Sequence, residues 1–307
     1  MLKINFIRAS DRYKFAVATI VEPIARILET YADVEVETDV YKAEDDAVNV
    51  YSFFDEGYLT EVGGLKGVTV HLPHGAADKD YLTAERMDMF DYCVVTGEYH
   101  RDKLITEGLS AERIILGGFT KFSVLNILDD TYSFRKLKPF TVLYAPTHGG
   151  DNKANLCSLE HSKNGDIVAE LEGNGFEVES SLHPNEAEDH RCTTDLLIKA
   201  DVVVSDCSSI IYEAWHLNKP VVFLDWMVKG FIAQHYPKSA ENEIYTKGIG
   251  RHANNMIDAI KMIREAAKYG ITYDEKDMLD KISSLSLRFR APNIIAKSLA
   301  TIGGLMK

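Results

Sequence analysis

The sequence predicts an α/β fold with two doubly wound halves, each built on a parallel sheet. Short β-rich runs alternate with longer helical patterns along almost the whole chain, as βαβ units require. A length of 307 residues suggests two domains rather than one. A polar, basic, Pro-bearing segment at Thr131–Phe140 is typical of a linker, and the alternation restarts after it.

The first half is predicted to be a domain over residues 1–133. Strands are expected at residues 3–9, 33–38, 47–53, 67–72 and 91–97, and helices at 14–31, 83–89 and 98–107. The glycine pair within Leu116–Phe122 indicates a turn between a strand and a helix, rather than a phosphate loop.

The second half is predicted to be a domain over residues 139–290. Its strands are expected at residues 140–146, 176–184, 200–206 and 220–226. The end of the chain has mostly helical patterns, the clearer ones at 253–268 and 293–305. We expect residues 291–307 to form a last helix that crosses back onto the first domain.

Composition and charge exclude several classes of protein. A hydrophobic content of 46% is that of an ordinary globular chain, and a net charge of -13 argues against a nucleic-acid partner, since phosphate neutralisation needs an excess of Lys and Arg. Residues 251–307 are mildly basic, with ten Lys or Arg against six Asp or Glu. The positive charge of this segment is typical of a solvated helix face. A patch that binds a membrane or a polyanion stays open as the alternative.

The cysteines and the N-terminus indicate a cytoplasmic protein. Cys93, Cys157, Cys192 and Cys207 show no CxxC pairing, and Cys93 and Cys207 lie in or beside strand-like runs, which fits reduced, buried thiols. The N-terminus lacks the apolar core of a signal peptide, and no segment reaches the run of about 18 apolar residues that a spanning helix needs.

Four polar clusters follow predicted strands, where ligands bind in open parallel sheets. They are HLPHGAADKD (His71 to Asp80), YAPTHGGD (Tyr144 to Asp151), SLHPN (Ser181 to Asn185) and SDCSS (Ser205 to Ser209). From them we take Gly75, His148 and Asn185 as candidates for donor binding, together with the residues discussed next.

The SDCSS cluster opens a predicted helix. A phosphate placed there would meet unpaired backbone N–H groups and the hydroxyls of Ser208 and Ser209 beside Asp206. Simple N-capping by Asp or Ser is the alternative. A second serine is redundant for capping, so we expect an anion site here.

Two histidines are candidates for the chemistry. His74 precedes a glycine just past an apolar strand, and an imidazole titrates near neutral pH, as a general base for a hydroxyl requires. His183 precedes a proline, which keeps it in an extended loop where it could donate to phosphate. An ordinary packing or loop role is the alternative for both.

Other signatures are missing from the sequence. It contains no GxGxxG after the first strand, no GxxxxGK[ST], no HExxH and no GxSxG. The acidic pairs at 45–46 and 129–130 lack the support that a metal site needs, and we expect no metal and no cofactor.

The order HLPHG, LYAPT, LHPN and ADVVVSDCSSIIYEAWHLNKPVVFLD resembles the CDP-glycerol glycerophosphotransferases, which include teichoic acid polymerases. The resemblance covers chiefly residues 67–225. It implies a GT-B architecture of two facing Rossmann-like domains, and transfer of glycerol phosphate or a related polyol phosphate from a CDP-linked donor to an acceptor hydroxyl, with release of CMP.

Carried over by position, the resemblance makes His74 the base and places His183 on the donor phosphates. It implies that Asp206, Ser208 and Ser209 line the donor site, with Thr147 near it and His74 across the cleft. The chain departs from the family at Pro73, where an aromatic is usual, at His148, and at Cys207, where Tyr is common. The implied acceptor is a polyol phosphate or surface glycan, and a lipid-linked acceptor with membrane contact at the inner face stays open.

Two alternatives remain. One is a GT-B glycosyltransferase or epimerase that uses a nucleotide sugar, because the cleft and the diphosphate site would be shared. Glu213, one turn into the helix after Ser208, could grip a ribose in either enzyme. The other is a non-catalytic scaffold that binds a nucleotide sugar. The oligomeric state is not indicated by the sequence.

Overall fold

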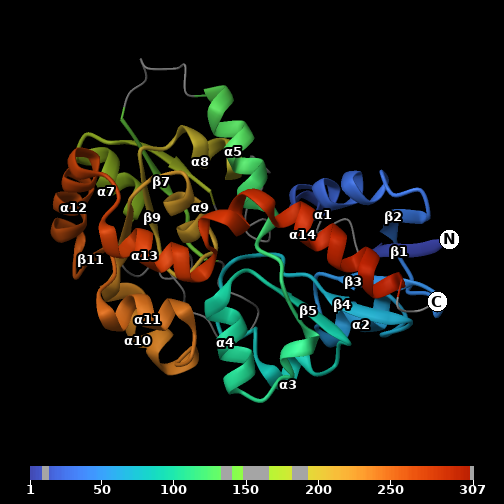
Figure 1. Cartoon of the computed structure of the whole chain (residues 1–307). Coiled ribbons are helices and arrows are strands. Elements are labelled where there is room, and N and C mark those ends of the chain that lie inside the picture. Colours follow the sequence, from blue (N-terminus) through green and yellow to red (C-terminus); the bar gives the residue numbers. More distant parts are fainter. Residues whose placement is uncertain (9–13, 133–139, 148–165, 182–192, 305–307) are drawn as a thin grey trace. The chain divides into compact units, whose positions relative to one another are not determined.

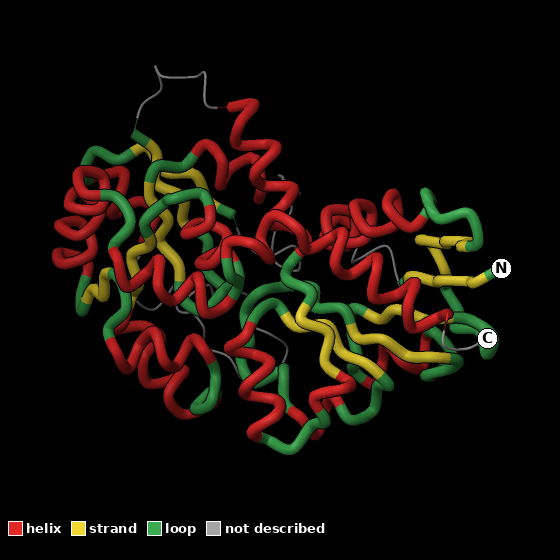
Figure 2. The backbone as a smooth tube through the Cα atoms, viewed as in Figure 1, coloured by secondary structure: helices red, strands yellow, loops and turns green. Residues whose placement is uncertain are grey.

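Two parallel sheets organise the protein. The computed structural model describes residues 1–8, 14–132, 140–147, 166–181 and 193–304. Unit 1 comprises Met1–Ala76, Tyr81–Val124 and Asp280–Lys307, and unit 2 comprises Ala77–Asp80 and Leu125–Leu279 (Figure 1). Helices alternate with the strands of both sheets (Figure 2), which confirms the predicted class of two doubly wound domains.

Unit 1 contains, in its described residues, a six-stranded sheet in the order β2-β1-β3-β4-β5-β6. Its strands are β1 (Leu2–Ile7), β2 (Val34–Val40), β3 (Val48–Tyr51), β4 (Val68–His71), β5 (Tyr92–Val95) and β6 (Ile114–Leu116). The helices are α1 (Lys14–Leu28), α2 (Glu56–Glu61), α3 (Ala84–Met87), α4 (Glu98–Thr106) and the 3-10 turn η2 (Ala111–Arg113), and α5 (Thr120–Tyr132) leads out of the unit. The strand order reverses between β1 and β3, so a ligand crevice is expected at their carboxyl ends.

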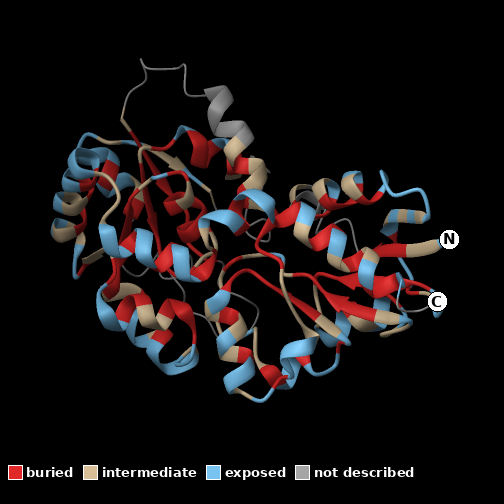
Figure 3. Cartoon of the chain, viewed as in Figure 1, coloured by how far each residue is buried: buried red, intermediate tan, exposed pale blue. Residues whose placement is uncertain are grey.

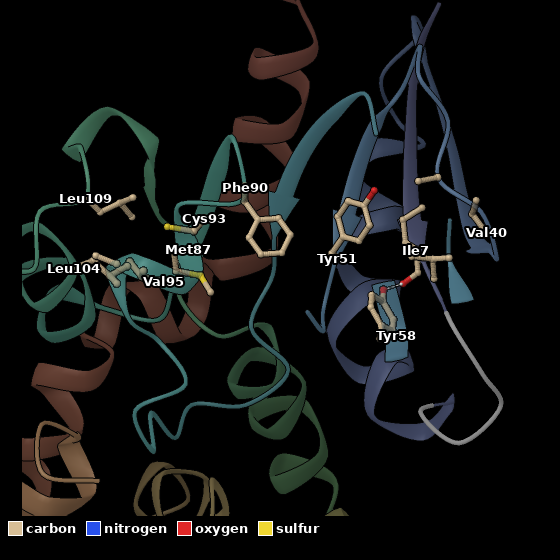
Figure 4. Packing of buried hydrophobic residues seen from close by; sticks show 13 residues of the cluster. Ile7, Val40, Tyr51, Tyr58, Met87, Phe90, Cys93, Val95, Leu104 and Leu109 are labelled. Atoms are coloured by element: carbon tan, nitrogen blue, oxygen red, sulfur yellow. Dashed lines mark hydrogen bonds between the residues drawn. The ribbon is translucent and has the colours of Figure 1, made fainter. Parts of the chain in front are cut away.

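The core of unit 1 is apolar and aromatic. The rings of Tyr51 and Phe90 lie 5.9 Å apart by their centroids, beside the buried thiol of Cys93 (Figure 4). The Tyr58 hydroxyl donates to the Ile7 carbonyl over 2.9 Å. The buried phenolic oxygen of Tyr58 therefore has a hydrogen-bond partner, and this bond connects the end of β1 to α2.

Unit 2 contains, in the residues described, a five-stranded sheet in the order β11-β10-β9-β7-β8. Its strands are β7 (Thr141–Tyr144), β8 (Glu177–Ser180), β9 (Val202–Ser205), β10 (Val221–Leu224) and β11 (Arg251–Ala253). Its helices are α7 (Ile167–Gly173), α8 (Thr193–Lys199), α9 (Ile210–His216), α10 (Asp225–His235), α11 (Ala240–Lys247), α12 (Met256–Tyr269) and α13 (Tyr273–Ile282), the last of which ends in unit 1. Strands β7, β9 and β10 are buried along their whole length (Figure 3), and the order reverses between β7 and β9.

The last helix, α14 (Leu285–Gly304), belongs to unit 1 and packs against α1 and β1. Leu287, Ala291 and Ile295 lie on its buried face, spaced as one side of a helix. The expected return of the C-terminal helix to the first domain is confirmed.

The structure differs from the predicted elements in a few places. Strand β11 was not predicted, because three residues are too few to show a period. Strand β6 was predicted only through the turn expected at the glycine pair, and the structure confirms this turn between β6 and α5. The helix expected from residue 253 begins at Met256, where the Asn255 side chain accepts from the Asp258 amide as its cap. Helix α5 runs to Tyr132, into the predicted linker, and most of that linker lies outside the described residues.

A close backbone contact within unit 1 connects the end of α13 to the residues that follow β5. The Thr96 hydroxyl, just past β5, donates to the Ile282 carbonyl over 3.1 Å. A Cβ built on the neighbouring Gly97 would lie 2.1 Å from that carbonyl oxygen. Only glycine therefore fits at position 97, for reasons of space.

We expect Gly97→Ala to lower the free energy of unfolding by about 2 kcal/mol, because the methyl group must displace backbone rather than a flexible side chain. Urea unfolding followed by circular dichroism measures this change. Gly304→Ala is the control, since nothing lies within 4 Å of its Cβ position. Equal stabilities for the two variants would contradict the packing argument.

Candidate functional site

The carboxyl edge of the unit 2 sheet brings two of the predicted clusters together. Thr147 follows β7 and Asp206 follows β9, at the point where the strand order reverses. The Thr147 amide donates to both carboxylate oxygens of Asp206 at 3.0 and 2.9 Å, and its hydroxyl donates to Oδ1 at 2.6 Å. The YAPT and SDCSS motifs thus form one structure at the position where doubly wound sheets bind ligands.

Asp206 is surrounded by donors of the protein itself. Its side chain is completely buried and also accepts from the Cys207 amide at 2.5 Å. The hydroxyl of Tyr245 donates to its carbonyl oxygen over 3.1 Å. These bonds hold the turn after β9 in place, so the structure gives Asp206 a part in shaping the site.

Cys207 is a packed thiol. It is 0% exposed, and burial, followed by the charge of Asp206, raises its pKa to about 12. A thiol with this pKa stays protonated at neutral pH. A thiolate nucleophile therefore does not fit Cys207, and the burial predicted for it and for Cys93 is confirmed, while Cys157 and Cys192 lie outside the described residues.

Ser209 does not cap the helix in the way that the capping alternative required. It precedes α9 with φ -56° and ψ -21°, which is already helical, and its side chain makes no capping bond. Its Oγ accepts instead from the Ala77 amide over 3.1 Å. Ser208 precedes it, and Glu213 lies one turn into α9 with 4% of its surface exposed. The turn before α9 therefore carries Ser208 and Ser209, and the first turn of α9 carries Glu213.

His74 lies in unit 1, three residues beyond β4. Its ring stacks on Phe53 with centroids 4.5 Å apart, and its Nδ1 lies 2.9 Å from the Ser52 carbonyl oxygen. A carbonyl only accepts, so Nδ1 carries the proton and the lone pair of the neutral ring is on Nε2. The side chain is exposed and Gly75 after it is half-buried. This tautomer is the one that a general base needs.

Three predicted residues, His148, His183 and Asn185, lie outside the described residues. The roles of these three, and the expectation that His74 faces the serines, stay predictions. Among the residues that the structure does describe, no group of three or more His, Cys, Asp or Glu could hold a metal ion. Within the same ranges, no helix is long and apolar enough to cross a membrane.

Two features of unit 2 were missed by the sequence reasoning. Glu241, on α11, is 0% exposed and accepts from the Tyr212 hydroxyl at 2.6 Å. Asp225, the first residue of α10, lies with its Oδ1 2.6 Å from Nδ1 of His252 in β11. In the sequence, Glu241 follows Ser239 as an ordinary first-turn acid, so no signal separates it from a solvated residue.

Comparison of structures places the protein in a known class of fold. The wall teichoic acid polymerase TagF is similar with a TM-score of 0.63 at 12% identity, over 99% of this chain and 89% of that one. UDP-GlcNAc 2-epimerase from Neisseria meningitidis, solved with UDP-GlcNAc bound, is similar with a TM-score of 0.60 at 12% identity, over 98% of this chain and 100% of that one. These likenesses establish the GT-B fold, with two Rossmann-like parallel-sheet domains.

The same fold is found in MnaA from S. aureus, solved with UDP, with a TM-score of 0.56 at 12% identity over 99% of this chain and 98% of that one. No protein-family model and no curated protein matches the sequence. The fold is therefore shown, while the choice among the reactions that this fold supports depends on the site.

We expect Asp206→Asn to destabilise the protein by about 2 to 3 kcal/mol, because an amide cannot accept from the buried Thr147 and Cys207 donors on both of its atoms. Denaturant unfolding measures the loss. Asp195→Asn on the exposed side of α8 is the matched control and should change stability by less than about 0.5 kcal/mol. Equal values for the two variants would refute the role given to Asp206.

His71, in the HLPHG motif, is a buried imidazole in an aromatic setting. It is 4% exposed, and Phe54 and Phe90 lie with ring centroids 5.5 and 5.4 Å from it. In the described part of the chain neither of its ring nitrogens has a hydrogen-bond partner. Burial, followed by the charge of His74, lowers its pKa to about 3. His71 is therefore neutral in the folded protein.

Stability should consequently fall as the pH falls through the unfolded-state pKa of about 6.5, because the unfolded chain binds a proton that the folded chain does not. The contribution of His71 is complete above that pKa, and about 2 kcal/mol is lost between pH 7 and pH 5. Unfolding free energies of the wild type and His71→Leu across this range measure it. The variant should lose the dependence, whereas exposed His235→Asn should retain it.

Proposed function

We propose that the protein is a transferase that moves glycerol phosphate, or a related polyol phosphate, from a CDP-linked donor to a hydroxyl of a surface-glycan or teichoic-acid-like acceptor. CMP is the released product. The contact that carries this proposal is the pairing of Thr147 with Asp206, which joins two of the four motifs at the switch point of unit 2. A TagF variant soaked with CDPG, and the polymerase named in the same comparisons, support this choice of chemistry.

The donor side of the reaction is assigned to unit 2. Ser208 and Ser209 would donate hydroxyl hydrogens to the diphosphate, and His148, His183 and Asn185 would complete the set of donors. Glu213 would accept from a ribose hydroxyl. Neutral and cationic hydrogen-bond donors of this kind stabilise charge that develops on phosphate oxygens, without a metal ion.

The acceptor side is assigned to His74. Its Nε2 would take the proton of the acceptor hydroxyl while that oxygen attacks the phosphorus that carries the polyol. The bond from this phosphorus to the bridging oxygen of the diphosphate breaks, and CMP leaves with the bond's electron pair. The Ser52 carbonyl then stabilises the imidazolium, because it accepts from Nδ1 in both protonation states of the ring.

A nucleotide-sugar enzyme is the second candidate. The likeness to UDP-GlcNAc 2-epimerase favours it, since the TM-score of 0.60 is close to that of the polymerase. Both enzymes would bind a nucleoside diphosphate in unit 2, so the base and the group attached to the diphosphate distinguish them. A scaffold that binds such a nucleotide without turnover is the third possibility.

A ligand panel followed by a turnover assay tests the proposal. We expect CDP-glycerol or CDP-ribitol to raise the melting temperature more than UDP-GlcNAc does, and CMP to be released when a polyol-phosphate acceptor is added. His74→Ala should keep donor binding and lose turnover by at least about 100-fold, because the base is removed. His183→Ala should weaken donor binding as well.

His235→Ala on the exposed surface is the control and should leave both measurements unchanged. If only UDP-sugars raise the melting temperature, the phosphotransferase proposal is wrong and the nucleotide-sugar enzyme is supported. Donor binding without turnover by the wild type, across a panel of acceptors, would indicate the scaffold.

A further inference from the structure

The turn Ala77–Asp80 belongs to unit 2 and is held there by its own backbone amides. The Ala77 amide donates to Ser209 Oγ over 3.1 Å. The next two amides, of Asp78 and Lys79, donate to the two carboxylate oxygens of Glu241 over 3.3 and 2.8 Å. Three successive amides therefore depend on two side chains, one of which is the candidate phosphate-binding Ser209.

The turn has a backbone conformation that its residues disfavour. Lys79 has φ 44° and Asp80 has φ 54°, in the left-handed region where a Cβ is crowded. Two consecutive residues of this kind need support from their surroundings. The bonds to Glu241 supply that support at the position where the chain turns.

Glu241 is fully engaged by the protein. It is 0% exposed and also accepts from the Tyr212 hydroxyl at 2.6 Å. Burial, followed by the neighbouring Asp78, raises its pKa, and Asp78 itself is 1% exposed. Both oxygens of this buried carboxyl group therefore accept hydrogen bonds from the protein. Two of the three donors are amides of the turn, so Glu241 holds the turn in place.

We propose that Glu241 is a positioning residue for the phosphate site. It holds the turn so that the Ala77 amide occupies a lone pair of Ser209 Oγ. A serine hydroxyl has one hydrogen and two lone pairs, so a fixed donor on the oxygen restricts where that hydrogen points. The hydroxyl is thereby oriented to donate to a phosphate oxygen of the ligand. This inference rests on the proposed function, since it needs a nucleoside diphosphate as the ligand.

The test is a double-variant cycle on Glu241 and Ser209, with CDP as the probe and calorimetric titration as the measurement. Glu241→Gln should raise the Kd for CDP roughly tenfold, as expected if the binding-competent turn is populated about one tenth of the time. Ser209→Ala should weaken binding by at least as much. The double variant should be no weaker than Ser209→Ala alone, because Glu241 acts through that hydroxyl.

Glu243→Gln is the matched control, two residues along the same helix and paired with Lys247 on the surface. It should leave the Kd unchanged. In the turnover assay Glu241→Gln should raise KM for the CDP-linked donor while kcat changes little, which a general loss of folded protein would not produce. If Glu241→Gln does not fold, Glu241→Asp retracts the carboxylate by one methylene and should give the same pattern.

The outcomes separate this inference from the proposed function. A wild type that binds neither CDP nor CDP-glycerol overturns both. Two results would overturn the positioning role alone, provided that the wild type binds CDP. One is a Kd of Glu241→Gln equal to that of the wild type. The other is a loss of affinity in the double variant equal to the sum of the two single losses.

Discussion

The hydrogen bonds between the buried carboxylate of Asp206 and the Thr147 backbone and side chain fix the geometry of the candidate site. They connect Thr147, which follows β7, to Asp206, which follows the adjacent parallel strand β9, at the point where the strand order reverses. A carboxylate accepts several hydrogen bonds at once, so one side chain can determine the path of two loops. The serines of SDCSS consequently follow a turn that these hydrogen bonds hold to Thr147.

This arrangement explains why acidic residues surround a site proposed for an anion. Asp206 and Glu241 are completely buried, and each is covered by N–H and O–H donors from neighbouring elements. These donors occupy their oxygens, so their effect is to hold backbone segments in position. In the proposed reaction the serine hydroxyls after Asp206 would then meet the diphosphate, whose negative charge grows on the leaving oxygen.

Much of the fold could be predicted from the sequence, because buried parallel strands such as β9 and β10 are continuous apolar runs bounded by polar turns. Strand β11 was missed, because it has three residues and is defined by its pairing with β10. In the site, the proximity of Thr147 to Asp206 followed from strand ends meeting at one edge. The role of Glu241 could not be predicted in this way, because its burial depends on a turn that lies 162 residues earlier in the chain.

The same reasoning separates shaping residues from reacting ones elsewhere in unit 2. Glu275 is 0% exposed and accepts from Trp215 Nε1 at 2.9 Å and from the Thr272 amide at 2.6 Å. A buried acid in an enzyme fold suggests a catalytic acid when it has few partners, because burial then favours the neutral form that can donate a proton. An acid covered by donors instead keeps its oxygens occupied. By this criterion Asp206, Glu241 and Glu275 organise turns, and the proposed reaction assigns its proton transfer to His74, whose Nδ1 donates to the Ser52 carbonyl.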